Sequence, residues 1–449
     1  MGKQLIFLFL SVFVSAIAMA ETVVCTEGCL SKAVTDKSVL QLTVSGYMDV
    51  RDFNFISENL QLLNLDISQV AIKGYTCRYG EQFFGMRGNF DADAIPQYSF
   101  FGSKIETIKL PSSLKAIGEA SFAGCRNLCN IEIPATVEYI SNSSFHSSGI
   151  STASISAKHI GDNAFAGCKN LSSVTLGISV EHIGNSAFEA CNALSSLTIA
   201  DDSQLSSIGE KAFANTAIAS FDFSKCMKVS SVGCWAFAGS PITNASLPDN
   251  LGEVADGIFF GNQSVSTINI PAAAYTIGDY AYYGNSSAKY ITIPSKIASI
   301  GNNAFENTGL VEVVALPEGV PELGKDVFKN VNNDRHRANL YVNENYIEAY
   351  RSALQWNEFN IKIDDGSSVE NICSNNRITA HFEGPSLIVN ADDNISSIAV
   401  STESGINIAL KSPMSKSTVI DTQHFAGYIY IVSVTLVDGT VKKIKLLRK

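Results

Sequence analysis

Charged side chains are scarce in this sequence, and basic ones are scarcer than acidic ones. Asp, Glu, Lys and Arg together form 17% of the 449 residues, whereas about a quarter is usual for a soluble protein. The formal net charge is −11, from 32 basic and 43 acidic residues. This charge gives no electrostatic basis for binding nucleic acid or an anionic membrane, so we expect neither as a partner.

Catalytic motifs are also missing. The sequence has six histidines and two tryptophans, and it contains no nucleophile elbow, phosphate-binding loop, dinucleotide fingerprint or metalloprotease helix motif. Acidic pairs such as Asp201-Asp202 and Asp364-Asp365 fall in apparent loops, where turn chemistry explains them. The sequence therefore predicts no enzyme, no catalytic residue and no cofactor.

A long hydrophobic run occurs only within the first twenty residues. Lys3 provides a positive start, residues 5–17 are apolar, and Ala18 and Ala20 form a small-x-small cleavage site before Glu21. This pattern predicts a secretory signal peptide at 1–20 and hence export. No other segment approaches the length of a membrane span, so no transmembrane segment is predicted.

An aromatic residue recurs through the middle of the sequence at intervals of 20 to 25 residues. Five residues before each ring stands an aliphatic residue, eleven times in eleven, which chance would produce on the order of once in millions. Such self-similarity is the signature of a repeat array. The rings are Phe100, Phe122, Phe145, Phe165, Phe188, Phe213, Phe237, Phe259, Tyr282, Phe305 and Phe328. The aliphatic residues are Ile95, Ile117, Ile140, Ile160, Ile183, Ile208, Val232, Val254, Ile277, Ile300 and Leu323.

Each repeat has the other features of a coil. The residue after the aliphatic one is glycine in eight of eleven copies, among them Gly161 and Gly301, which lets neighbouring coils approach closely. Downstream of the ring comes a strand template, apolar-x-x-apolar-x-apolar, as at Leu171, Val174 and Leu176. We therefore expect one short strand and one turn per coil, with adjacent coils about 4.8 Å apart.

The segment 160–176 reads Ile-Gly-x-x-Ala-Phe-x-Gly-Cys-x-x-Leu-x-x-Val-x-Leu, which resembles the BspA-like leucine-rich repeat family. The resemblance covers 95–331 and implies a mostly β leucine-rich repeat solenoid of about eleven to twelve coils of about 23 residues. Residues 21–94 resemble an N-terminal cap with an opening repeat at 60–69, and 332–365, with Tyr350 and Trp356, resemble the closing cap. The resemblance also implies a role as an adhesin or host-interaction factor.

Beyond residue 365 the aromatic period stops. Alternation at 428–434 predicts a half-buried strand, Asp438-Gly439 a hairpin turn into 441–447, and 386–389 and 396–400 earlier strands. Residues 366–449 are thus predicted to form a small antiparallel, sandwich-like β domain. The segment 427–432 and the lysine-rich end resemble the type IX secretion sorting domain, although Ile406 follows Gly405 where that family often has arginine. The resemblance implies a cell-surface or extracellular protein associated with the outer membrane; an ordinary β-sandwich module is the alternative.

Ten cysteines in a chain expected to be exported raise the question of disulfides. Cys125, Cys168 and Cys191 each lie three residues after a repeat ring and are predicted to fill one recurring buried slot as inert thiols. Cys25 and Cys29 are the better candidates for a disulfide.

The strand template leaves alternate side chains on the outer surface, because successive residues of a strand point to opposite faces. These positions are rich in Ser, Thr and Asn, and they form the candidate binding face. They are Asn130, Glu132, Ser173, Thr175, Ser196, Thr198, Ser220, Asp222, Asn244, Ser246, Thr267, Asn269, Tyr290 and Thr292. Two interpretations stay open: these residues merely solvate an exposed sheet, or they form a hydrogen-bonding platform for protein or glycan.

His159 and His182 each precede a repeat aliphatic residue, so they should lie on neighbouring coils about 5 Å apart. Two such ligands could begin a metal site, but Tyr139 and Ser207 at the equivalent positions are poor ligands. Zinc in proteins takes at least three protein ligands. We therefore expect solvated surface histidines and no metal.

Taken together, these features predict a secreted or cell-surface binding or adhesion protein. It is expected to be monomeric and to contact protein or glycan on a host or neighbouring cell through the outer surface of its solenoid. A structural spacer or display scaffold without a specific ligand is the alternative, and a hydrolase with an unrecognised site is a third reading.

Overall fold

The computed structural model describes residues 20–332, 337–364, 378–383, 386–402, 407–422, 429–437 and 441–447. The chain divides into two compact units. The first contains the described residues of Met1–Lys289, Pro294–Leu310 and Gly319–Arg337, and the second those of Tyr290–Ile293, Val311–Glu318 and Ala338–Lys449. The predicted signal peptide lies outside the described residues apart from Ala20, which begins β1.

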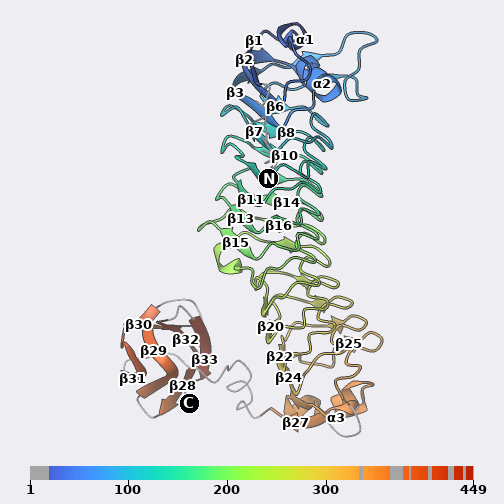
Figure 1. Cartoon of the computed structure of the whole chain (residues 1–449). Helices are drawn as coiled ribbons and strands as arrows, with labels where there is room; N and C mark the ends of the chain where they lie inside the picture. Colours follow the sequence, from blue (N-terminus) through green and yellow to red (C-terminus); the bar gives the residue numbers. More distant parts are fainter. Residues whose placement is uncertain are drawn as a thin grey trace, which may run out of the picture. The chain divides into compact units, whose positions relative to one another are not determined.

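The first unit is a solenoid whose coils pair with one another through short parallel strands (Figure 1). We call the strands that carry the predicted template, together with β1–β3 before them, the front column. It contains β1 (Ala20–Cys25), β2 (Gln41–Met48), β3 (Asn64–Ile72), β7 (Thr107–Lys109), β9 (Asn130–Ile131), β11 (Thr152–Ile155), β13 (Ser173–Leu176), β15 (Ser196–Ile199), β18 (Asn244–Ser246) and β20 (Thr267–Asn269).

A second column of two-residue strands ends in the repeat aliphatic residues, and we call it the side column. It contains β6 (Ala94–Ile95), β8 (Ala116–Ile117), β10 (Tyr139–Ile140), β12 (His159–Ile160), β14 (His182–Ile183), β16 (Ser207–Ile208), β17 (Ser231–Val232), β19 (Glu253–Val254), β21 (Thr276–Ile277), β23 (Ser299–Ile300) and β25 (Glu322–Leu323). The prediction of one strand per coil is therefore wrong. Two residues are too few to show an alternating pattern in a sequence.

The aromatic repeat forms the core of the first unit. The eleven rings stack in one column with neighbouring centroids 5.1 to 5.8 Å apart and planes within 19° of parallel. Each ring residue is at most 3% exposed. Among the repeat aliphatic residues all are buried except Leu323, which is half-buried. The predicted column of stacked rings is confirmed, and its spacing is close to that of strands in a sheet.

The repeat glycines are needed because neighbouring coils approach closely. A Cβ atom on Gly301 would lie 2.4 Å from the Asp279 side chain and 2.5 Å from its backbone nitrogen. The left-handed backbone of each coil lies elsewhere, two residues before and two residues after the ring, as at Asn163 and Gly167 with φ of 56° and 69°. Asparagine adopts this conformation more readily than most residues.

An Asn or Asp side chain links many of the coils, and this ladder is not predicted from the sequence. At the second residue after the repeat aliphatic residue, the side-chain Oδ1 accepts a hydrogen bond from the backbone N–H of the equivalent residue in the next coil. The distances are 2.6 to 2.9 Å for the acceptors Asn142, Asp162, Asn185, Asp256, Asp279 and Asn302. These bonds satisfy backbone donors at the turn, which would otherwise depend on water.

The recurring cysteine slot is buried, as predicted, but it is a hydrogen-bonding position. Cys125, Cys168 and Cys191 are free thiols with no exposed surface. The Cys168 Sγ donates to the carbonyl oxygen of Phe145 at 3.0 Å, and Ser240 and Asn262 make the same bond in later coils. Burial raises the pKa of Cys168 to about 11, so the thiol stays protonated and unreactive.

The N-terminal part of the first unit adds short helices to the front column. These elements are α1 (Leu30–Ala33), α2 (Val50–Asn59), and the antiparallel pair β4 (Tyr75–Thr76) and β5 (Asn89–Phe90). The buried Asp52 carboxylate accepts from the backbone N–H of Gly28, Leu30 and Asp49 at 2.7 to 3.0 Å, which ties the two helices together. Cys25 and Cys29 are both free thiols, so the candidate disulfide is not formed.

The second unit contains two sheets. A four-stranded parallel sheet consists of β22 (Tyr290–Ile293), β24 (Glu312–Ala315), β26 (Asn339–Val342) and β27 (Asn360–Ile363). It is accompanied by η2 (Glu344–Tyr346), α3 (Ile347–Ser352) and η3 (Trp356–Glu358). Tyr350 and Trp356 are buried with their rings edge to face, 5.2 Å apart.

The other sheet of the second unit is antiparallel, and it confirms the predicted small β domain. Its strands are β28 (Ile378–Glu383), β29 (Ser386–Thr402), β30 (Asn407–Lys411), β31 (Ser415–Asp421), β32 (Ile429–Leu436) and β33 (Val441–Leu447). The two strands predicted at 386–389 and 396–400 are halves of the single strand β29. One half pairs with β28 and β31, and the other half with β30 and β32. The predicted turn at Asp438-Gly439 lies outside the described residues, between the antiparallel strands β32 and β33.

Candidate binding surface

The predicted binding face is built from the outward positions of the front column. Parallel pairing places Ser173 beside Ser196 and Thr175 beside Thr198 on β13 and β15. Ser173 is half-buried and the other three are exposed, while the alternate residues Val174 and Leu176 of β13 are buried in the core. Asn244, Thr267 and Asn269 are likewise exposed on β18 and β20, and Ser246 is half-buried. Alternation therefore places the predicted side chains on the outer surface of these strands, as expected.

The face is not one continuous sheet. Within the first unit the front column pairs as three separate sheets, ending at β9, β15 and β20. Asn130 lies on β9 and Glu132 follows it, both exposed. Tyr290 and Thr292 lie on β22 of the second unit. The prediction that every position lies on a single sheet surface is therefore wrong.

Ser220 and Asp222 are the clearest departure, because no strand forms at these residues. Phe221 packs edge to face against the core rings Phe213 and Phe237, 5.6 and 5.3 Å away. The chain then turns into η1 (Phe223–Lys225), where the Asp222 side chain accepts a hydrogen bond from the backbone N–H of Ser224 at 3.0 Å. An extra ring in the core thus outweighs the alternating pattern that predicted a strand here.

Hydrogen bonds between neighbouring strands occupy part of this polar surface. Asn269 Nδ2 donates to Ser246 Oγ at 2.6 Å, and Lys109 Nζ donates to Asp66 at 2.9 Å. The bond from the Lys109 ammonium lowers the pKa of the Asp66 carboxyl. Such pairs fit the interpretation that these side chains stabilise the exposed sheet. Among the described residues, the side chains of Thr175 and Thr198 form no such pair.

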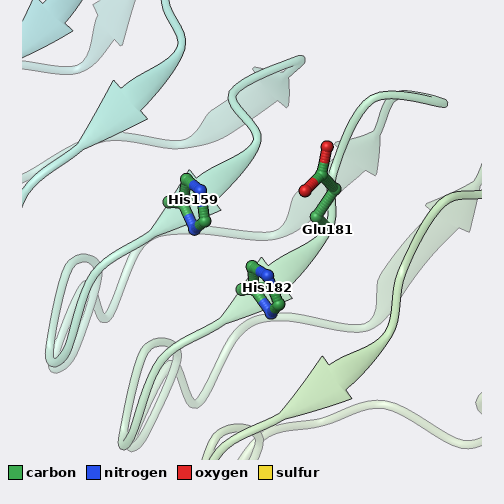
Figure 2. Close-up of side chains that lie close together, drawn as sticks. All are labelled: His159, Glu181 and His182. Carbon is green, nitrogen blue, oxygen red and sulfur yellow. The ribbon is translucent and has the colours of Figure 1, made fainter. Parts of the chain in front are cut away.

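His159 and His182 lie on β12 and β14, as the repeat predicts, and Glu181 joins them (Figure 2). Their potential ligand atoms all lie within 4.8 Å of one another, and all three residues are half-buried. The rings, however, stack with centroids 4.8 Å apart and planes 13° from parallel. The nitrogen lone pairs lie in the ring planes, so two nearly parallel planes offer no shared point for one ion.

The histidine stack is better described as a packing ladder. Tyr139 on β10 stacks on His159 with centroids 5.1 Å apart. His182 Nδ1 lies 2.8 Å from the Ser207 hydroxyl and 3.3 Å from that of Ser206. The Nδ1 atom of His182 thus already has partners within the solenoid, and we assign no metal to this cluster.

A cavity of about 170 Å³ lies beside the N-terminal helix α2. Its wall contains apolar side chains such as Leu62 and Phe100 together with Ser57 and Lys104, and it has neither a carboxylate nor a histidine. The acidic pair Asp201-Asp202 lies in a turn, where Asp201 pairs with Lys225 at 3.1 Å. Neither place has the two facing carboxylates that glycoside hydrolysis requires.

Within the described residues, no helix combines the length and the apolar composition needed to cross a bilayer. The front column, the side column and the stacked core rings together define a leucine-rich repeat solenoid. The family model described as "BspA type Leucine rich repeat region (6 copies)" matches residues 93–216 and 206–334. These matches together cover more than half of the 449 residues, and the chain belongs to this family.

Solved leucine-rich repeat proteins resemble this chain at low sequence identity. One from Bacteroides ovatus is 18% identical over 66% of this chain and 91% of that chain, with a TM-score of 0.35. The pneumococcal vaccine antigen PcpA is 15% identical over 73% of this chain and 80% of its own, with a TM-score of 0.36. A leucine rich cell surface protein from Faecalibacterium prausnitzii is 18% identical over 66% of this chain and 79% of its own, with a TM-score of 0.33. No curated protein matches the chain.

Proposed function

We propose that this protein is an exported cell-surface protein that binds a protein or glycan partner through the outer surface of its solenoid, without catalysis. One observation carries the proposal: the front column presents exposed, uncharged polar side chains in register, as Thr175 beside Thr198. Val174, Leu176 and Ile199 of the same strands are buried in the core. Membership of the BspA-type leucine-rich repeat family supports a binding role.

The proposal includes a route to the surface. The signal-like pattern at 1–20 would direct export, and the β domain at 366–449 would act as a type IX sorting domain. The proposal also assigns the caps of the repeat array at 95–331 to residues 21–94 and 332–365. Cell fractionation with mass spectrometry of the mature C-terminus tests the route. A protein found at the surface with its C-terminal β domain removed is expected, and retention of the full chain inside the cell would refute it.

Capture of immobilised partners tests the binding role. The full chain is applied to arrays of extracellular-matrix proteins and of glycans, beside a Thr175→Arg/Thr198→Arg variant. The two arginines place bulk and charge on the face and leave the buried side of each strand unchanged. Asn170→Arg, on an exposed turn of the same coil, is the matched control. We expect a limited set of partners whose capture falls at least about tenfold in the double variant and not in the control.

The spacer alternative makes the opposite prediction. The Asn and Asp ladder and the stacked rings tie each coil to the next, which also suits a rigid display scaffold. Such a scaffold would show no selective capture on either array. Capture that is equal for the double variant and the control would place the binding surface away from the front column.

A further inference from the structure

We propose that four aromatic side chains on the turns of three successive coils form a binding site for a cationic group, such as a lysine or arginine side chain of a partner protein. We call Trp235, Phe260, Tyr280 and Tyr283 the aromatic turn cluster. The proposal rests on the proposed binding function, and it names the chemistry of one partner.

The four rings form one connected group outside the core column. Phe260 and Tyr283 stack with centroids 4.8 Å apart and planes 10° from parallel. Trp235 lies 5.1 Å from Phe260 and 6.3 Å from Tyr280, and its plane is tilted by 58° and 30° respectively. All four side chains are half-buried, so part of each ring faces solvent. Rings at different tilts around a small area are the arrangement that surrounds an organic cation.

The core of the solenoid does not require these rings. They occupy two turn positions of the repeat, two residues before the core ring and one residue after it. At each of these positions eight of the eleven copies have a residue that is not aromatic, such as Ala120, Asn163 or Ala214. Those coils still stack their core rings at the same spacing. The turn therefore folds with small or polar side chains, and the clustered rings need another explanation.

The backbone at the cluster makes the choice of large rings more unusual. Trp235 and Tyr280 have φ of 59° and 58°, a region that is sterically disfavoured for residues with a bulky side chain. Gly257, at the equivalent position of the coil between them, leaves room for the indole. A Cβ atom there would lie 2.4 Å from the Trp235 ring.

Charge around the cluster favours a cation as the ligand. Asp256 and Asp279 directly precede Gly257 and Tyr280, and neither forms an ion pair within the described part of the chain. Each uses Oδ1 in the Asn and Asp ladder, which leaves the negative charge in place. The faces of aromatic rings are also negative, so rings and carboxylates attract the same kind of group.

Two lysines at the same turn positions of flanking coils already have acidic partners. Lys211, which precedes Trp235 at the equivalent position of the coil before, pairs with Glu210 at 2.9 Å. On the other side, Lys329 pairs with Glu306 at 3.5 Å. The cluster therefore keeps a local negative charge that is complementary to a basic segment.

The fluorescence of Trp235 can report binding at this site. The chain has two tryptophans, and Trp356 is buried while Trp235 is half-buried. The full chain is titrated with a capped nonapeptide of alternating arginine and serine, and Trp fluorescence is followed at 150 mM salt. The same peptide with glutamate for arginine and a neutral chito-oligosaccharide are the comparison probes. We expect a saturable fluorescence change with the arginine peptide alone, which is absent in Trp235→Phe.

Two kinds of variant test the assignment of residues. Tyr283→Ala removes one ring and should weaken the arginine peptide roughly two- to thirty-fold, the range of cation–π contributions. The ring control is Phe101→Ala, since Phe101 is the same turn position in another coil and is 63% exposed. It should leave the Kd unchanged.

The charge of the cluster is tested by replacing aspartate with asparagine, which occupies the same position in other coils. Asp256→Asn/Asp279→Asn removes two charges and keeps both ladder acceptors, because Asn142 and Asn185 act as acceptors elsewhere. We expect binding at least about fivefold weaker. Asp162→Asn, the same substitution in a coil without turn rings, is the control and should have no effect.

Several results would overturn the proposal. One is no arginine-peptide binding; another is equal weakening by Asp162→Asn, which would mean nonspecific attraction to an acidic protein. Binding of the oligosaccharide that survives the double substitution would make the cluster a glycan site. The capture experiment uses variants of the front column, so its result does not depend on these outcomes. Failure of the cation-site proposal is therefore distinguishable from failure of the proposed function.

Discussion

Tyr282 offers the sharpest test of the stacked core, because it is the one tyrosine among eleven core rings. It is 0% exposed and lies between Phe259 and Phe305 at 5.8 and 5.4 Å. Its hydroxyl has no hydrogen-bond partner among the described residues, and burial raises its pKa far above the usual value. A buried hydroxyl without a partner costs about 1–3 kcal/mol.

Tyr282→Phe removes this hydroxyl and keeps the ring. We expect the free energy of unfolding to rise by about 1–2 kcal/mol, which moves the urea midpoint up by about 0.3–0.7 M at an m-value of about 3 kcal/mol/M. Circular dichroism measures the transition, and amide exchange on the neighbouring coils resolves it if the solenoid unfolds in steps. Phe305→Tyr, which adds a hydroxyl in the next coil, should lose about 1–3 kcal/mol. A destabilised Tyr282→Phe, or an unaffected Phe305→Tyr, would refute the account of a dry ring column.

Three further predictions follow from burial and charge. Phe213→Ala removes a ring stacked on both sides and should lower the free energy of unfolding, measured in urea, by about 3–5 kcal/mol. Replacing an exposed serine of the strand face with alanine should lower it by about 0.5 kcal/mol or less. Equal effects would mean that the assignment of buried and exposed positions is wrong. Alkylation followed by mass spectrometry should label the exposed Cys129 in the folded chain and Cys168 only after unfolding; early labelling of Cys168 would contradict its burial. The Asp66 carboxyl has a lowered pKa in the folded chain because its partner Lys109 donates to it. This pair should stabilise the folded state at neutral pH by about 0.2–1 kcal/mol and lose that contribution as the pH falls below about 4. An NMR titration that gives Asp66 an ordinary pKa would refute this prediction.

The positions of the binding candidates are less predictable from the sequence than those of the core residues. The alternation around Ser220 and Asp222 predicts a strand as strongly as that at Ser173 and Thr175, yet only the latter pair lies on one. The difference is tertiary: Phe221 finds space beside two core rings, which a single repeat cannot reveal. The position of Glu181 beside both histidines is not predicted for a related reason. Its approach to His159 on the preceding coil depends on how the turns pack.

The aromatic turn cluster was visible in the sequence but was not recognised there. Trp235, Phe260, Tyr280 and Tyr283 lie at fixed offsets from the core rings, so an alignment of the copies by position would have placed them on one surface. The tilts of the rings and the space above Gly257 are properties of the stacked turns, and no alignment provides them.

What the amino-acid order determined by itself is the repeat: ring, aliphatic residue, glycine and strand template recur at a nearly constant period, and only stacking in register buries them all. Tertiary structure alone decided the second strand of each coil, the breaks in the front column and the direction in which each polar group points. These depend on contacts between residues about 23 positions apart, whose energies are set by close packing rather than by local preference.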